Sequence, residues 1–240
     1  MNKLYDDCES TNDLLKSEAL KGCPNGSWIA SRVQTKGRGR QGKAWIGLDG
    51  NLFLSVLLRF ESNENLTWVP LAIGISLAHF LKSRFLDLKI QIKWPNDLLV
   101  QHSKLAGILC ETVQSTSVIA GIGLNCAKSP SIIDQPTINL SEALNRTIIA
   151  EDLLPELPEW IFNDVKRVNC SELSRKFEQL SLFKLKDQLN WKNANGSEQF
   201  GIYNGLGPLG ELRALSSTGT ECSLFSEEVR QIRSSNEKLL

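Results

Sequence analysis

The chain has 240 residues, of which 41% are hydrophobic and 22% are charged, and its 27 basic side chains are balanced by 27 acidic ones. This composition is typical of a folded globular protein and excludes disordered, collagen-like and coiled-coil classes. Because the net charge is zero, the chain cannot bind nucleic acid through bulk charge, and any site for an anion must be built locally.

Export and membrane insertion are both disfavoured by the sequence. The longest apolar stretch, from Trp68 to Leu81, is shorter than a bilayer span requires, so we expect no transmembrane helix. Acidic residues follow Met1 closely, where a signal peptide would be apolar. The six cysteines are scattered without a Cys-x-x-Cys pair, which favours free thiols. We therefore expect a cytoplasmic protein without a membrane partner.

The first part of the chain predicts helices and strands around a polar loop. Ser10 precedes a run of helix-forming residues and is expected to be an N-cap. Strands are predicted at 27–30 and 51–58, and a glycine-rich basic loop at 36–43 connects them. Pro70 opens a mostly apolar helix, which we expect to be central and buried.

The middle of the chain alternates between apolar and polar residues, as half-buried strands do. The alternation begins at residues 88–94, and further short strands are predicted at 98–100, 104–112 and 118–125. Four successive strands on short turns predict an antiparallel meander. Helices are expected near residue 160 and at 171–182, so the fold class is α+β, with a mixed or antiparallel sheet and flanking helices.

After Lys184 the pattern changes to strands of about five residues separated by Gly, Asn and Ser turns. This spacing predicts a small β-barrel. We therefore expect two domains, 1–183 and 184–240.

The basic loop is the first candidate site. It places Lys36, Arg38, Arg40 and Lys43 within eight residues of a neutral chain, and its three glycines allow close backbone approach to a ligand. The spacing fits neither a P-loop nor a dinucleotide-binding loop. The loop would suit a local anion and is expected to be mobile when empty. The alternatives are a solvated surface loop and an RNA contact.

Two further patterns could carry chemistry. A hairpin would bring Asp97 close to Lys104, and Asn96 and Asp97 could bind a hydrated Mg²⁺ or orient a nucleophile. The alternative is a Pro-Asn-Asp turn with a surface lysine. The strand 120–125 ends in Gly121-x-Gly123-x-Asn125, where glycines allow close approach by a ligand or by another part of the backbone.

Together, these motifs resemble those of the biotin protein ligase family. The resemblance covers residues 9–126 and rests on six motifs in the family's order: Ser10-Thr11-Asn12, Gln34, Gly37-Arg38-Gly39-Arg40-x-Gly42 with Trp45, Lys93-Trp94-Pro95-Asn96-Asp97, Lys104-Leu105-Ala106-Gly107-Ile108-Leu109 and Gly121-x-Gly123-x-Asn125. It implies an α+β catalytic domain followed by a small SH3-like barrel. Many members carry an N-terminal DNA-binding domain, but this chain begins nine residues before Ser10. We therefore expect the monofunctional form, with no DNA partner.

The resemblance implies that ATP activates biotin as biotinyl-5′-AMP, with Mg²⁺, and that a lysine of a biotin carboxyl carrier protein then receives the biotinyl group. A homodimer is compatible with the family. The implied biotin-binding residues are Ser10, Thr11, Asn12, Gln34, Arg38, Gly39, Lys104 and Gly107. The implied ATP-binding residues are Arg38, Arg40, Trp45, Asn96, Lys104 and Asn125. The implied catalytic residues are Arg40, Lys104 and Asp97, with Asp97 orienting the incoming lysine or accepting its proton.

The chain departs from the family pattern in three places: Gln41 replaces a basic residue, 46–48 replaces a Ser-Pro-like segment, and 226–229 follows the C-terminal motif only loosely. Two other functions stay open. One is a lipoate or octanoate ligase or transferase of the same fold. The other is an RNA-binding module that uses the Arg/Gly loop.

Overall fold

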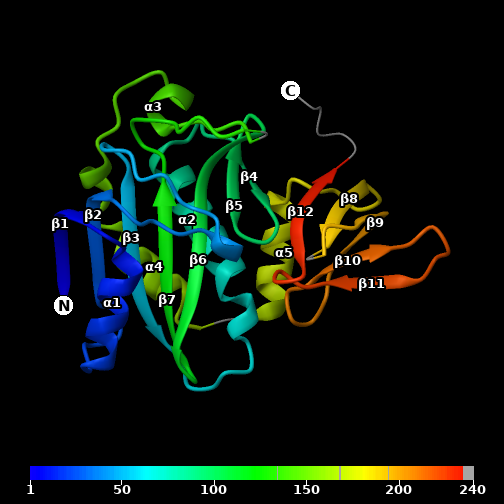
Figure 1. Ribbon diagram of the computed structural model, residues 1–240, viewed down its shortest axis with the longest axis horizontal. Helices are drawn as coiled ribbons and strands as arrows, with labels where there is room; N and C mark the ends of the chain where they lie inside the picture. The colour runs from blue at the N-terminus through cyan, green and yellow to red at the C-terminus, as the bar shows by residue number, and fades with distance from the viewer. Residues whose placement is uncertain (134, 168, 194, 235–240) are drawn as a thin grey trace.

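The computed structural model describes residues 1–133, 135–167, 169–193 and 195–234, and it contains two sheets (Figure 1). The larger sheet has seven strands in the order β1-β2-β3-β7-β6-β5-β4. Their bounds are β1 Asn2–Cys8, β2 Trp28–Gln34, β3 Leu52–Arg59, β4 Ile90–Lys93, β5 Asp97–Val100, β6 Ser103–Gln114 and β7 Ser117–Leu124. Strand β1 runs parallel to β2, whereas the other neighbours are antiparallel. The sheet is therefore mixed, as predicted.

Helix α1, Thr11–Leu20, covers one face of the large sheet (Figure 1). Ser10 is its N-cap, and the Ser10 side chain accepts a hydrogen bond from the backbone N–H of Asp13. Such a cap satisfies an N–H group that the helix itself leaves unpaired. Leu15 and Ala19 of α1 pack on Leu57 in a small apolar cluster. This packing places the start of the helix over β3 and β7.

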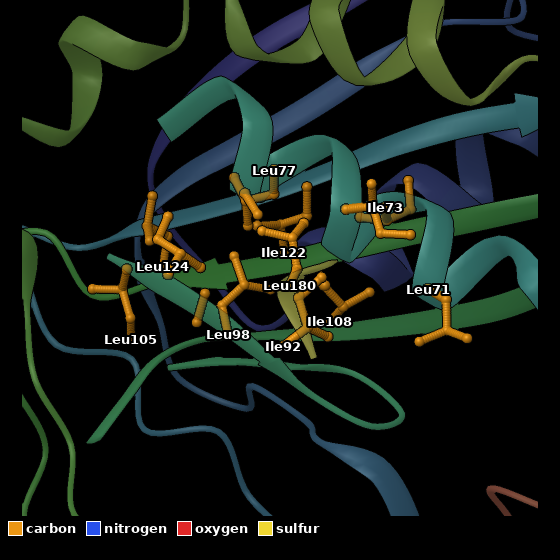
Figure 2. Packing of buried hydrophobic residues seen from close by; sticks show 14 of the residues in the cluster. Leu71, Ile73, Leu77, Ile92, Leu98, Leu105, Ile108, Ile122, Leu124 and Leu180 are labelled. Carbon is orange, nitrogen blue, oxygen red and sulfur yellow. The ribbon is translucent and has the colours of Figure 1, made fainter. Parts of the chain in front are cut away.

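Helix α2, Val69–Arg84, packs on the opposite face. It is apolar on nearly all sides and begins with Pro70 in its first turn, so it is buried as predicted. Figure 2 shows the labelled side chains Leu71, Ile73 and Leu77 against those of the sheet. Each such buried aliphatic side chain contributes about 1.5–3 kcal/mol. The stretch 66–84 is long and apolar enough to cross a membrane by those two criteria alone, but 67% of its apolar window is buried inside the protein, as in a core helix.

Three more helices complete the first unit. They are α3 Leu140–Ala143, α4 Leu157–Val165 and α5 Cys170–Leu180. Helices α4 and α5 agree with the helices predicted near residue 160 and at 171–182, and α5 ends two residues earlier than predicted. Strand β1 is absent from the sequence-based prediction. It is an edge strand whose side chains are exposed or half-buried, so it lacks the apolar alternation by which strands are recognised.

The second sheet is antiparallel, with the order β11-β10-β9-β8-β12. Its strands are β8 Gln188–Asn193, β9 Glu198–Leu206, β10 Leu212–Leu215, β11 Glu221–Leu224 and β12 Val229–Ser234. The predicted α+β fold with a small C-terminal β unit is confirmed.

The core runs from one unit into the other without a break. Trp191 and Tyr203 of the small sheet belong to the same apolar cluster as α2 and the large sheet. The indole N–H groups of Trp68 and Trp94 donate to the carbonyl oxygens of Pro208 and Gly210. We propose that the two domains are 1–183 and 184–240, of which 235–240 lie outside the described residues. Their shared core indicates that they are held in one arrangement.

Candidate active site

A cavity of about 1160 Å³ lies between the large sheet, the basic loop and the small sheet. All thirteen residues to which the sequence analysis gives a site role line it: Ser10, Thr11, Asn12, Gln34, Arg38, Gly39, Arg40, Trp45, Asn96, Asp97, Lys104, Gly107 and Asn125. Among the described residues, the lining also contains eight Lys and Arg side chains but a single carboxylate, that of Asp97. In a chain of zero net charge, this imbalance makes the cavity the place where an anion is favoured.

The N-terminal turn supplies a polar corner of the cavity. Thr11 donates from its N–H and its hydroxyl to Gln34 Oε1, at 2.8 and 3.0 Å. Ser55, which is fully buried on β3, lies 2.8 Å from the Thr11 hydroxyl and donates to Asn12 Oδ1 at 2.6 Å. The amide of Asn12 lies so close to Gly121 that a Cβ atom there would collide with it. Glycine at 121 is therefore a packing requirement of this corner.

The floor of the cavity is formed where Gly107 on β6 pairs with Gly123 on β7. The Trp45 indole lies over both glycines, and a Cβ atom at either position would overlap the ring. The indole Nε1 is buried without a hydrogen-bond partner among the described residues. Lys104 Nζ lies 5.3 Å from the centre of the ring, within cation–π range. The indole thus covers the glycine floor directly.

Asp97 and Lys104 face each other across the β5–β6 hairpin, as predicted. Lys104 Nζ lies 2.8 Å from Asp97 Oδ1, and their side chains are 15% and 17% exposed. The contact is an ion pair without hydrogen-bond geometry, so Asp97 Oδ1 is buried with no hydrogen-bond donor in the described structure. A carboxylate in this state can accept a hydrogen bond from a ligand.

Arg40 is half-buried and begins a short 3-10 turn at Arg40–Gly42. Its guanidinium donates to Asn96 Oδ1 at 3.1 Å and to the carbonyl oxygen of Ser226. Burial lowers the pKa of Arg40 from its usual value, while the charges of Asp97 and Glu227 act in the opposite direction. Asn96 is itself fixed, because it donates to the carbonyl oxygen of Ile108 at 2.8 Å. The loop therefore joins the large sheet to the small one.

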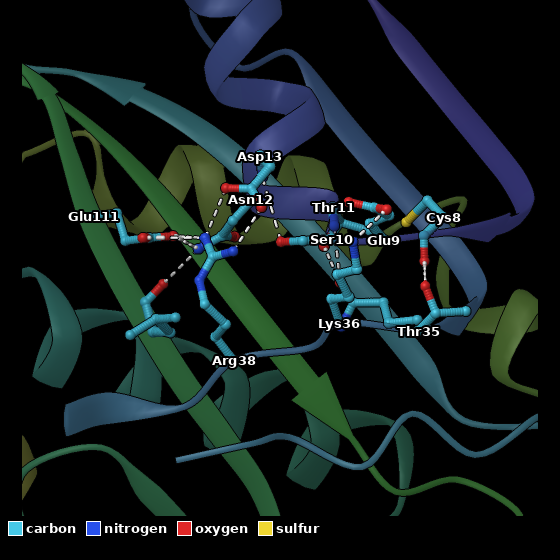
Figure 3. A network of polar contacts seen from close by, with 12 residues as sticks. Cys8, Glu9, Ser10, Thr11, Asn12, Asp13, Thr35, Lys36, Arg38 and Glu111 are labelled. Carbon is cyan, nitrogen blue, oxygen red and sulfur yellow. Dashed lines mark hydrogen bonds and ion pairs between the residues drawn. The ribbon is translucent and has the colours of Figure 1, made fainter. Parts of the chain in front are cut away.

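Arg38 has a different environment, shown in Figure 3. Its guanidinium donates to both carboxylate oxygens of Asp13, at 2.5 and 2.7 Å, and lies 3.3 Å from Glu111 Oε1. These hydrogen bonds raise the pKa of Arg38 above its ordinary value and hold the pKa of the Asp13 carboxyl below its own. Lys36, two residues before Arg38, forms an ion pair of 2.7 Å with Glu9.

The side chain of Asn125 makes its hydrogen bonds to other groups of the protein. Its side chain is 2% exposed and donates to the carbonyl oxygens of Lys104 and Ile138, at 3.4 and 3.2 Å. Asn51 donates to its Oδ1 at 3.4 Å. Asn125 lines the cavity, and its contacts fasten the segment around residue 138 to β6.

Several lining residues carry no signal in the sequence. They come from residues 130–133 and 135–137, from the β5–β6 turn at His102, and from the small sheet, which contributes Lys192, Arg230 and Arg233. Asp13 and Glu111, which hold Arg38, were missed as well. A motif search cannot find them, because their partners lie far away in the sequence.

The described residues contain no cluster of three or more His, Cys, Asp or Glu side chains that could hold a metal ion. All six cysteines are free thiols. Burial raises the pKa of both Cys110 and Cys126 to about 12, so these two thiols are inert core groups rather than nucleophiles.

Comparison with known proteins agrees with this geometry. The sequence profile of the biotin/lipoate A/B protein ligase family matches residues 5–126. The chain is 36% identical over 161 residues to the bifunctional ligase/repressor BirA of Escherichia coli K12. The aligned region covers 62% of this chain and 50% of BirA. It is 34% identical over 158 residues to the biotin–[acetyl-CoA-carboxylase] ligase of Mycobacterium tuberculosis, covering 62% of this chain and 59% of that one. The chain thus spans about half the length of the curated relatives it matches.

Similarity to a solved structure extends over the whole fold. The biotin protein ligase of Aquifex aeolicus, solved in complex with biotin and ATP, superposes with a TM-score of 0.82 at 26% identity, covering 98% of this chain and 99% of that one. Its coverage includes both sheets. From the matched profile, which spans half of the chain, and from this fold, the chain belongs to the biotin/lipoate A/B protein ligase family.

Proposed function

We propose that the protein is a biotin protein ligase, which activates biotin with ATP as biotinyl-5′-AMP and then transfers the biotinyl group to a lysine of a carrier protein. The observation that carries this proposal is the cavity, whose described lining places eight cations and one carboxylate around a polar corner and a glycine floor. The solved relative from Aquifex aeolicus binds biotin and ATP, which supports the same two ligands here.

The first step needs cations more than it needs a nucleophile. A carboxylate oxygen of biotin attacks the α-phosphorus of ATP, a new P–O bond forms, and the bond to pyrophosphate breaks. Both reactants are anions, so fixed positive charge lowers the barrier by offsetting their repulsion and the charge that develops. Arg40 and Lys104 are placed for this, since both line the cavity and converge on the Asn96–Asp97 turn.

Biotin is assigned to the polar corner. Thr11, Gln34 and Asn12 present hydroxyl and amide groups there, which suit a neutral ring with both donors and acceptors. Ser10, Gly39 and Gly107 complete the wall of this pocket. Trp45 covers the glycine floor, and we assign its indole to shielding the adenylate from water. Asn125 helps to place ATP through the segment that it fastens.

Mg²⁺ would accompany ATP. In the part of the lining that the structure describes, the donors are the carboxylate of Asp97 and the amide oxygen of Asn96. This small donor set fits an ion that takes most of its ligands from phosphates and water. Bound there, Mg²⁺ would neutralise phosphate charge.

In the second step the lysine nitrogen attacks the biotinyl carbonyl carbon, an amide bond forms, the C–O bond to AMP breaks, and the nitrogen gives up a proton. The lysine must be neutral to attack, and Asp97 carries the single carboxylate among the described residues that line the cavity. We assign it to orienting the amine or accepting its proton. The name of one relative, a biotin–[acetyl-CoA-carboxylase] ligase, supports a carboxylase as the acceptor. We assign the acceptor lysine to the biotin carboxyl carrier protein of such an enzyme and the reaction to the cytoplasm.

The experiment that tests this function is exchange of labelled pyrophosphate into ATP with biotin, with lipoate and with no acid. Exchange that depends on biotin supports the proposal. Exchange with lipoate instead would favour the other branch of the family, whose profile covers both acids. Absence of exchange together with tight RNA binding would favour an RNA-binding module.

A further inference from the structure

The environment of Arg38 differs from that expected of a residue that binds an anion. Its guanidinium lies between two carboxylates (Figure 3). It makes two hydrogen bonds to Asp13, at 2.5 and 2.7 Å, and an ion pair of 3.3 Å with Glu111. Two carboxylates around one guanidinium leave a local charge of −1. Such a cluster repels a carboxylate or a triphosphate, even after screening by solvent.

Arg40, two residues away, has the opposite environment. Both hydrogen bonds that its guanidinium makes in the described structure go to neutral oxygens, Asn96 Oδ1 and the Ser226 carbonyl. Its charge is therefore still available to an anion. The structure therefore distinguishes the two arginines of the loop by their hydrogen-bond partners, which are carboxylates for Arg38 and neutral oxygens for Arg40.

Glu111 connects the Arg38 cluster to the polar corner. Besides Arg38, it binds Asn12, whose Nδ2 donates to Glu111 Oε2 at 2.6 Å. Asn12 Oδ1 in turn accepts from Ser55 at 2.6 Å. One carboxylate on β6 therefore fixes both a side chain of the N-terminal turn and the first half of the basic loop.

We propose that Asp13 and Glu111 are positioning residues, which hold Arg38 as a strut so that the loop backbone and Asn12 are placed for biotin before it binds. Arg38 is then an anchor of the loop rather than a ligand of the anions. This role rests on the proposed function, because it concerns the pocket assigned to biotin. It departs from the roles in biotin and ATP binding that the family resemblance gives Arg38.

The test uses three variants, Asp13→Asn, Glu111→Gln and the two combined. In pyrophosphate exchange we expect the KM for biotin to rise by about fivefold in each single variant, the scale of one partly exposed charge-assisted contact, with kcat changed less than about twofold. The KM for ATP at saturating biotin should stay within about twofold. Asp13→Glu keeps the charge and should restore much of the affinity for biotin.

The two interpretations of Arg38, as an anchor of the loop or as a ligand of the anions, predict changes in KM of opposite sign. If Arg38 were an anion ligand, removing carboxylates beside it would free its charge, and the KM for ATP or biotin would fall. A lower KM in the double variant would therefore overturn the proposal. Glu9→Gln is the matched control: it removes a carboxylate from an ion pair of the same loop, with Lys36, in which both side chains are 68% exposed. It should leave both KM values unchanged.

A second measurement does not depend on activity. Hydrogen exchange of residues 36–44 in the ligand-free protein should be faster in Glu111→Gln and in the double variant than in wild type, by about threefold or more, and unchanged in Glu9→Gln. Equal hydrogen exchange in wild type, Glu111→Gln and the double variant would contradict the proposal that the two carboxylates hold the loop through Arg38. If the wild-type protein showed no biotin-dependent pyrophosphate exchange, the proposed function would fail, while hydrogen exchange would still decide whether the two carboxylates hold the loop.

Discussion

The two halves of the basic loop rest on different parts of the molecule. The half with Arg38 lies against the start of α1, where its cation is 39% exposed and shared between carboxylates. The half with Arg40 lies against the small sheet, where Ser226 and Asn96 hold the guanidinium and burial lowers its pKa. The same side chain, repeated after one glycine, therefore meets two electrostatic environments. The difference teaches that partners and burial, more than residue type, decide which cation can meet an anion.

The largest effect is expected from the half with Arg40. Arg40→Ala and Lys104→Ala should each slow formation of the adenylate by about 10²–10³-fold. Each substitution removes a fixed positive charge that stabilises the negative charge developing on the phosphate. The measurement is single-turnover synthesis of biotinyl-5′-AMP. Arg32→Ala is a control, since Arg32 pairs with Asp6 and Glu151 at the surface, and it should act like wild type. Normal synthesis in both Arg40→Ala and Lys104→Ala would show that the anion site is elsewhere.

Asp97→Asn tests the negative group that the described residues contribute to the cavity. Its carboxylate should hinder the first step, in which two anions meet, and help the second, in which a proton leaves the attacking lysine. We expect transfer of preformed biotinyl-5′-AMP to a carrier domain to fall by about 10²-fold or more, and adenylate synthesis to fall far less. If synthesis collapses while transfer stays normal, Asp97 instead positions ATP or its metal.

A smaller effect is expected where the loop meets the small sheet. Gln41 donates to the carbonyl oxygens of Glu227 and Val229, at 3.3 and 3.1 Å. Gln41→Ala should lower the rate of adenylate formation by about three- to tenfold, the scale of one or two neutral hydrogen bonds. Gln41→Arg keeps the N–H donors and should retain most of the rate. Equal losses in both variants would mean that the side chain acts by packing, not by donating.

The smallest effect concerns the exposed half and pH. A carboxyl group whose pKa is lowered in the folded protein stabilises that state above its unfolded pKa, and this stabilisation is lost as the pH falls through the lowered value. Arg38 lowers the pKa of Asp13, so the pair should hold from neutral pH down to about pH 4, near the ordinary pKa of aspartate. Hydrogen exchange of the loop, corrected for its intrinsic pH dependence, should be constant over that range. Loss of protection between about pH 6 and 5 would contradict the pairing.

Local patterns predicted much of the fold. The Ser10 cap, the helix opened by Pro70 and the hairpin that joins Asp97 to Lys104 depend on residues within a few positions of one another, and all three are present in the structure. Strand β1 was missed because an exposed edge strand needs only its neighbour β2 and no apolar face of its own. Its partner residues lie more than twenty positions away in the sequence.

The candidate site shows the same division. The motifs predicted which side chains meet, and all thirteen line one cavity. They did not predict that Glu111 would pair with Arg38, 73 positions earlier in the sequence. Nor did they predict that the Asn125 amide would donate to a carbonyl oxygen inside the protein. These contacts form only where two strands and a loop come together in the folded protein. A short sequence motif cannot predict them, because their partners lie far apart in the sequence.

The sequence by itself determined helices α1, α2, α4 and α5, the meander, the small β unit and the inventory of cations and amides, because capping, periodicity and turn chemistry act over short distances. Only the tertiary structure decided how the charges are distributed. It brought Asp13 and Glu111 to one arginine and left neutral oxygens for the other, and it added Lys192, Arg230 and Arg233 from the small sheet to the cavity. Electrostatic energy depends on distance in space and on burial, which is why a neutral sequence can fold around a strongly basic cavity.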